Sequence, residues 1–259
     1  MTTFLHELGG ISLFFSQVVR TAIRTRGNMN RIHGQIVDVT WRSLSTVVFA
    51  GIFVGAILVL QFSQILNRYD ASVLLGGLNT SAIVREVGPL LISFLLAGKI
   101  GAYTAAELGT MRITEQIDAV QCLGTNPIQY LVVPRFVGIV VSSLILLVIG
   151  LVVSILGSMV VAAALCDVNP LQFAQSVPRY IDGWTVAGGL FKSFVFGTIV
   201  ATVSCFKGYT ASGGARGVGR AVTMAAVYTN LFMVLSDFAT SAILEWVQSM
   251  VMSITGGAT

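Results

Sequence analysis

Charged residues are scarce in this chain. Of 259 residues only 10% are Asp, Glu, Lys or Arg, whereas 55% are hydrophobic. Soluble globular domains carry about 25% charged residues, so this composition excludes an ordinary soluble protein. The apolar residues form long runs that do not alternate as barrel strands do, and about 20 such residues in a helix cross a bilayer. The sequence therefore predicts an all-α, polytopic membrane protein.

Histidine and cysteine are also rare. His6 and His33 both precede the first long apolar run, and the 3 cysteines are isolated from one another. A histidine-based catalytic or metal site within the membrane is therefore excluded, and no disulfide framework is indicated. The glycine-rich stretch 213–220 lacks the Gly-Lys-Ser/Thr ending of a P-loop. We expect no catalytic residue, no metal and no cofactor in this chain.

Five apolar runs are long enough to be predicted as transmembrane helices. They cover residues 45–66, 87–106, 136–165, 188–206 and 222–246. The third run carries no charge and is long enough to tilt in the bilayer. We expect the five runs to form one membrane domain over residues 45–259.

An amphipathic pattern fills part of residues 1–44. Apolar side chains recur at helical spacing from Phe4 to Ala22, with Arg20 and Arg24 on another face. We predict a helix that lies in the membrane interface. The alternative is a cytosolic helix that packs on a partner.

The basic residues predict the orientation. They gather before the first span, between the second and third spans, and between the fourth and fifth spans. Cytoplasmic segments are enriched in Lys and Arg, so we predict a cytoplasmic N-terminus and a C-terminus on the outer side. The net charge of +4 reflects this asymmetry and predicts no binding of nucleic acid.

Ionisable residues within a span cost at least about 2.5 kcal/mol on insertion scales, so each one indicates a partner or a function. Lys192 and Asp237 fall in the outer halves of the fourth and fifth spans, and we predict that they form a structural ion pair. Arg85 and Glu86 lie at the outer end of the second span. They either lie in the interface without a specific role or face a cavity that engages a polar head group.

The segment 105–120 is polar and helix-patterned within this apolar chain. Arg112 and Glu115 are spaced to meet at i, i+3 on one helix. Helices that lie on lipid favour Lys and Arg, whereas this segment carries three acids and one base. We therefore predict a cytoplasmic amphipathic helix over about 105–120 that docks in a groove of another protein.

Several sequence blocks, in order along the chain, resemble a known family. They are Arg85-Glu-Val-Gly-Pro, Ala97-Gly-Lys-Ile-Gly, the segment 105–118, Leu123-Gly-Thr-Asn-Pro and Val133-Pro-Arg-Phe. With these blocks the chain resembles the MlaE/YrbE permeases, the membrane subunits of ABC transporters that work with MCE proteins. The resemblance extends from about Gly51 through the fifth span.

The resemblance implies a homodimeric permease in the bacterial inner membrane, with its C-terminus in the periplasm. It would move phospholipid between this membrane and a periplasmic MCE protein, in the maintenance of outer-membrane lipid asymmetry or in related lipid trafficking. A separate cytoplasmic ABC ATPase would bind the ATP. A small cytoplasmic subunit with a STAS domain is a further candidate partner.

The resemblance also assigns residues to roles. The segment 105–120 becomes the coupling helix, with ATPase contacts expected from Glu107, Arg112, Glu115 and Gln116. An outward-facing lipid cavity is expected between the first two spans, near the dimer axis. Its expected lining is Leu58, Gln61, Ile65, Leu66, Tyr69, Arg85 and Glu86.

Two other classes of function compete with this interpretation. An ion- or solute-coupled secondary transporter would use Glu86, Lys99 and Asp237, but no pair of broken, repeat-related spans supports it. A lipid-modifying enzyme would need an acid–base or metal set, which the sequence lacks.

Overall fold

The computed structural model describes residues 2–24 and 29–254, which form helices joined by short turns, with no strand among them. In this part of the chain, five helical segments are long and apolar enough to cross a membrane. They cover Met29–Asn67, Ser72–Ile113, Ile128–Leu165, Gly183–Tyr209 and Gly214–Met250. The prediction of an all-α polytopic membrane protein is confirmed.

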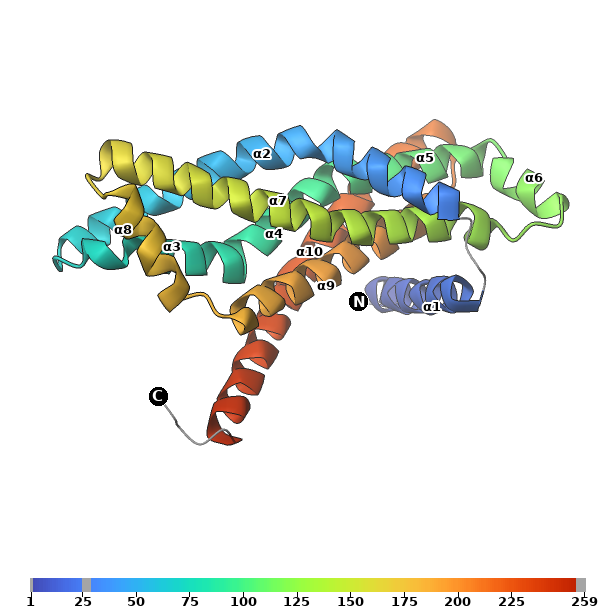
Figure 1. Cartoon of the computed structure of the whole chain (residues 1–259). Helices are drawn as coiled ribbons and strands as arrows, with labels where there is room; N and C mark the ends of the chain where they lie inside the picture. The colour runs from blue at the N-terminus through green and yellow to red at the C-terminus, as the bar shows by residue number, and fades with distance from the viewer. Residues whose placement is uncertain (1, 25–28, 255–259) are drawn as a thin grey trace.

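The first half of the chain contains α1 (Thr2–Arg24), α2 (Met29–Asn67), η1 (Ser72–Leu74), α3 (Leu75–Ala82), η2 (Ile83–Val87), α4 (Gly88–Leu96), η3 (Ala97–Gly101), α5 (Ala102–Ile113) and α6 (Gln116–Cys122). The second half contains η4 (Ile128–Val132), α7 (Val133–Leu165), α8 (Pro170–Ser176), η5 (Val177–Arg179), α9 (Gly183–Tyr209) and α10 (Gly214–Ile254). We call the end of the bundle that carries α8 the α8 end, and the opposite end, which carries α6, the α6 end (Figure 1).

The observed helices extend beyond the predicted apolar spans. The span predicted over 45–66 is the second half of α2, and the one predicted over 87–106 belongs to a helical segment that begins at Ser72. Hydropathy marks the part of a helix that matches lipid, whereas the helix itself continues into polar residues. Because α2 is continuous through residues 44 and 45, the boundary predicted there is a change in composition within one helix.

Two long helices, α2 and α7, lie side by side along the bundle (Figure 1). Gly55 of α2 is buried against α7, where an added Cβ would lie 2.1 Å from the carbonyl oxygen of Ser154. Only glycine permits the two backbones to approach this closely, as small residues commonly do between membrane helices. This contact fixes α2 on α7, while α9 packs on α7 from another side and also contacts α10 and α5.

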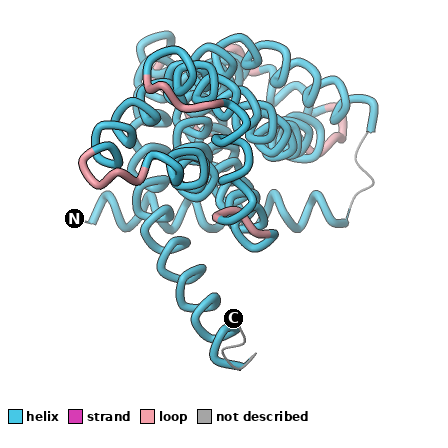
Figure 2. Tube along the Cα trace, turned by 60° about the vertical axis from the view of Figure 1, so that its left-hand side comes forward, coloured by secondary structure: helices cyan, strands magenta, loops and turns pink. Residues whose placement is uncertain are grey.

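The N-terminal helix α1 crosses the bundle beside α9 and η4 (Figure 2). Its side chains Phe14 and Val18 are buried in an apolar cluster at the α6 end. The ring of Phe14 lies 5.6 Å from that of Phe206, and Glu7 Oε2 lies 2.8 Å from Lys207 Nζ. The apolar face of α1 therefore packs on its own chain, and the position of this helix in the membrane interface stays a prediction.

Candidate functional site

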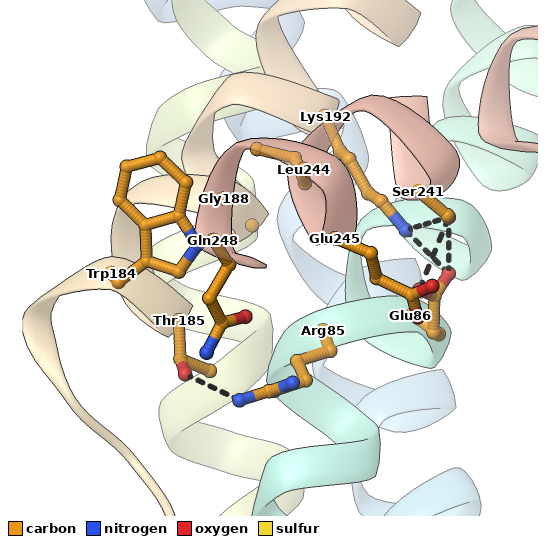
Figure 3. A pocket seen from close by; sticks show the side chains of 11 residues that line it. Arg85, Glu86, Trp184, Thr185, Gly188, Lys192, Ser241, Leu244, Glu245 and Gln248 are labelled. Carbon is orange, nitrogen blue, oxygen red and sulfur yellow. Dashed lines mark hydrogen bonds and ion pairs between the residues drawn. The ribbon is translucent and has the colours of Figure 1, made fainter. Parts of the chain in front are cut away.

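The second membrane-crossing segment changes from α to π geometry where it carries its adjacent charges. Arg85 and Glu86 lie in η2, and Pro89 follows in the first turn of α4. Proline lacks a backbone N–H, so the helix loses a hydrogen bond near this point, and π turns within helices are frequent at functional sites. Both charged side chains reach α9 or α10 from this wider turn (Figure 3).

Lys192 of α9 is the centre of an ion cluster, although only 1% of its surface is exposed. Its Nζ lies 2.5 Å from Glu86 Oε2 and 3.2 Å from Asp237 Oδ1 of α10, and it donates a hydrogen bond of 2.7 Å to Ser241 Oγ. A buried charge is tolerated only when it is paired and hydrogen-bonded. The cluster therefore joins three membrane-crossing segments, whereas the sequence predicts only the pair of Lys192 and Asp237.

Arg85 belongs to a second, separate network. Its Nη2 donates a hydrogen bond of 3.2 Å to Thr185 Oγ1, and this hydroxyl donates to Asp182 Oδ1 at 2.6 Å. Asp182 also accepts from the amide of Thr185 at 2.8 Å, so it caps the N-terminus of α9. These hydrogen bonds from Thr185 hold the pKa of Asp182 below its ordinary value. Arg85 forms no direct ion pair among the described residues, although its positive charge also helps to lower the pKa of Asp182.

The two networks border one small hollow between η2, α9 and α10, with a volume of about 60 Å³ (Figure 3). Its polar lining comes from all three elements and its apolar lining from α9 and α10. The lining residues are Arg85, Glu86, Trp184, Thr185, Gly188, Gly189, Lys192, Ser241, Leu244, Glu245 and Gln248. We call this space the α8-end hollow.

Several of these residues are missed by sequence reasoning, although the sequence contains a signal for them. Ser241 and Glu245 follow Asp237 at i+4 and i+8, so the three side chains share one face of a helix. Asp182 precedes Thr185 by three residues at the start of an apolar run, which is the pattern of a helix N-cap. Both features become informative only when Lys192 and Arg85 are known to face them.

The predicted lipid-binding set is divided in the single chain. Arg85 and Glu86 line the α8-end hollow, but the residues predicted from the first span do not. These are Leu58, Gln61, Ile65, Leu66 and Tyr69. Leu66 is buried in an apolar cluster with Phe173, whereas Ile65 is 54% and Tyr69 76% exposed. Of the predicted set, the single chain thus brings only Arg85 and Glu86 to this hollow.

At the α6 end, the predicted coupling helix is interrupted. α5 ends at Ile113 and α6 begins at Gln116, because Glu115 adopts a left-handed φ of 58° that turns the chain. The predicted contact of Arg112 with Glu115 is therefore wrong. Arg112 Nη1 instead lies 2.6 Å from Asp118 Oδ1, which closes the turn.

Two of the predicted ATPase contacts face a second hollow, of about 560 Å³, at the α6 end. Glu107 and Gln116 line it, together with Arg135 at the start of α7. Glu107 Oε1 lies 2.9 Å from Arg135 Nη2, and Arg135 also donates to the carbonyl of Leu131. Arg112 and Glu115 do not line this hollow.

Lys99 lies in η3 and bonds to α2. Its Nζ donates to the carbonyl of Arg42 and, at 3.0 Å, to Thr46 Oγ1. Glu86 and Asp237, in contrast, share Lys192. The three residues of the proposed ion pathway therefore belong to two unconnected sets of contacts, which does not favour a secondary transporter.

A family model described as Permease MlaE matches residues 32–243. The chain is 35% identical over 235 residues to a probable ABC transporter permease protein of Rickettsia felis, covering 91% of both chains. A probable ABC transporter permease protein of Synechocystis is 36% identical over 238 residues, or 88% of this chain and 90% of the relative. The Arabidopsis thaliana protein TRIGALACTOSYLDIACYLGLYCEROL 1, chloroplastic, is 30% identical over 232 residues, or 90% of this chain and 66% of that protein.

Proposed function

Since the chain belongs to the MlaE permease family, we propose that it is the membrane subunit of an ABC transporter that moves phospholipid. The similarity to ABC transporter permeases supports transport as the activity of the whole assembly. The α8-end hollow supports a lipid as the transported substrate. The Arabidopsis relative is named after trigalactosyldiacylglycerol, which is itself a lipid.

The observation that carries the lipid proposal is the position of Arg85. Among the described residues its guanidinium donates a hydrogen bond to the hydroxyl of Thr185 and forms no direct ion pair, and it lines a hollow among apolar membrane-crossing helices. Arg is well suited to a phosphate group, to which it donates two parallel hydrogen bonds. Trp184, which is 37% exposed, lines this hollow, and Trp is enriched at the level of lipid head groups. The hollow therefore suits the head group of a lipid whose acyl chains lie along the exposed apolar helix surfaces.

At the opposite end, α5 and α6 form the proposed contact with a cytoplasmic ATPase. Glu107 and Gln116 line a concave surface there, and Glu115 is exposed at the turn between the helices. In this arrangement the N-terminus is cytoplasmic and the α8 end faces the periplasm, where an MCE protein would receive or deliver the lipid. ATP binds to the partner and no cofactor binds to this chain. A small cytoplasmic STAS-domain subunit is a further proposed partner.

A second copy of the chain is proposed to complete the lipid cavity. The last turns of α10 project from the bundle (Figure 1), and apolar side chains such as Leu231, Val234 and Phe238 are exposed along α10. The exposed first-span residues Ile65 and Tyr69 would face the cavity from the partner or from the same chain. The proposed dimer would thereby bring Ile65 and Tyr69 to the cavity, whereas Leu66 stays buried within its own chain.

The proposed function is tested with the chain, its ATPase and its MCE partner reconstituted in liposomes. We expect a labelled phospholipid to pass to the MCE protein when ATP is hydrolysed, and not with a non-hydrolysable analogue. A proton or sodium gradient without ATP serves as the control for the secondary transporter. Transfer that follows the gradient and ignores ATP would refute the proposal.

A further inference from the structure

The charges around the α8-end hollow are not balanced. The hollow and its ion cluster hold three carboxylates, from Glu86, Asp237 and Glu245, but only two cations, Arg85 and Lys192. Lys192 is occupied by Glu86, Asp237 and Ser241, and its side chain is 2% exposed. Arg85 forms no direct ion pair among the described residues, although it interacts electrostatically with Asp182, so it is the cation available to a ligand.

Glu245 is the carboxylate available to a ligand. It lies two turns beyond Asp237 on the same face of α10, lines the hollow and is exposed. No ion pair or hydrogen bond of its side chain occurs among the residues that the structure describes. Figure 3 shows its carboxylate on the Glu86 side of the hollow, with the guanidinium of Arg85 apart from it.

A ligand that complements this arrangement carries one negative and one positive charge. Its phosphate would bind Arg85, and its cationic group would bind Glu245, on the side where the carboxylates are in excess. A purely anionic head group would satisfy Arg85 but would bring no positive charge to Glu245, so its net negative charge would be added where carboxylates are already in excess.

We infer that the hollow selects phospholipids with an amine-bearing head group, such as phosphatidylethanolamine, and that Glu245 is the residue that determines this specificity. The primary ammonium of ethanolamine is compact and carries three N–H donors, which suits a space of about 60 Å³ beside a free carboxylate. The amide of Gln248 also lines the hollow and can bind either end of the head group. This inference rests on the proposed function and adds the substrate class to it.

The experiment measures ATP-driven transfer of phosphatidylethanolamine and phosphatidylglycerol that carry the same labelled acyl chains, in competition within one reconstituted complex. The native complex is expected to transfer phosphatidylethanolamine several-fold faster. Glu245→Gln is expected to abolish this preference, and Glu245→Asp, which keeps the charge, to retain it. Because Glu245 is exposed and unpaired, neither change is expected to alter folding.

Asp167→Asn is the matched control, since Asp167 is an exposed carboxylate outside the hollow, just after α7. Asp167 has a left-handed φ of 54°, which Asn also adopts. The Asp167→Asn complex is therefore expected to show the same preference for phosphatidylethanolamine as the native complex. Equal transfer of the two lipids by the native complex, or an unchanged preference in Glu245→Gln, would overturn the inference while the proposed function stands. A complex that transfers neither lipid would instead refute the proposed function.

Discussion

The two ends of the bundle hold their charges in different ways. At the α8 end, Lys192 is 1% exposed and joins η2, α9 and α10 through two carboxylates and a hydroxyl. At the α6 end, Arg112 and Asp118 are 39% and 52% exposed and only close a turn between adjacent helices. Buried ion clusters are costly to disrupt, whereas exposed pairs contribute little to stability. The cluster at the α8 end therefore couples charge to the packing of the bundle, while the exposed pair of Arg112 and Asp118 at the α6 end can be changed without loss of the fold.

The largest effect is expected from the removal of the buried cation. Lys192→Ala removes the shared cation from Glu86 and Asp237, whose side chains are 50% and 22% exposed, so the cost is expected to be somewhat below the value of about 3 to 5 kcal/mol for a fully buried pair. Thermal unfolding of the purified protein in detergent should show a large loss of stability or no folded protein. The matched change at the α6 end, Arg112→Ala, is expected to alter stability by less than about 1 kcal/mol.

A charge swap sharpens this prediction, because Glu86 is a third member of the cluster. Lys192→Asp with Asp237→Lys restores the pair but places a new carboxylate against Glu86. We expect the double variant to remain unstable and the further change Glu86→Gln to recover most of the loss. Full recovery in the double variant would show that Glu86 contributes little to the cluster.

A smaller effect on folding, but a strong effect on transport, is expected for Arg85→Ala. Its side chain makes a single hydrogen bond to the described residues, to Thr185, so the fold should remain, while the charged contact to a phosphate is lost. Such a contact is worth about 1.5 to 3 kcal/mol, or roughly a 10- to 100-fold loss of lipid affinity. Lipid binding is measured with a spin-labelled or fluorescent phospholipid, and Arg68→Ala, in the turn just after α2, is the control. Unchanged binding would place the head group elsewhere.

At the α6 end, Glu115→Lys is expected to reduce ATP-driven transfer several-fold without loss of fold or of dimerisation. The side chain is exposed at the turn between α5 and α6 and makes no ion pair in the described part of the chain, so a reversed charge acts on a docked partner. ATPase activity and lipid transfer are measured together, and stability is measured as for Lys192→Ala. Transfer at the native rate would show that the coupling contact lies elsewhere.

The smallest effect is expected from the cap that supports Arg85. Asp182→Ala removes the N-cap of α9, at a cost of about 1 kcal/mol. Because hydrogen bonds lower the pKa of Asp182 in the folded state, its contribution is present above its ordinary value of 3.8 and is lost as the pH falls through the lower folded value. The native protein should therefore lose slightly more stability on acidification than Asp182→Ala does. Identical pH profiles would indicate that the cap does not stabilise the folded state.

The hydropathy of the sequence predicts much of the arrangement of membrane-crossing helices. Long apolar runs predict the five membrane-crossing helices, since a helix is the structure that satisfies its own backbone in lipid. The limits of the helices are not predictable in this way, because α2 continues through polar residues before Ser45 that no lipid contact requires. The break at Glu115 is also missed, since its left-handed conformation leaves no clear signature in the residue types around it.

Sequence reasoning identifies only those members of the candidate site that are charged residues within or next to the apolar runs. Lys192, Asp237, Arg85 and Glu86 are noticed because charge is costly within a span. Glu245 and Thr185 lie near the ends of their helices, where a polar side chain has little free-energy cost of membrane insertion. Their place in the hollow therefore becomes visible only when α9, α10 and η2 are placed together. The contact between Glu86 and Lys192 joins residues that are 106 positions apart, a pairing that helical spacing cannot reveal.

The most direct test of the division between the two ends combines two measurements on the same proteoliposomes. A phospholipid with a photoactivatable head group reports binding at the α8 end, and ATP-driven transfer to the MCE protein reports the whole cycle. We predict that Arg85→Ala loses both crosslinking and transfer, whereas Glu115→Lys loses transfer and keeps crosslinking at α9 and α10. Equal crosslinking in the two variants, or full transfer in either, would contradict the account.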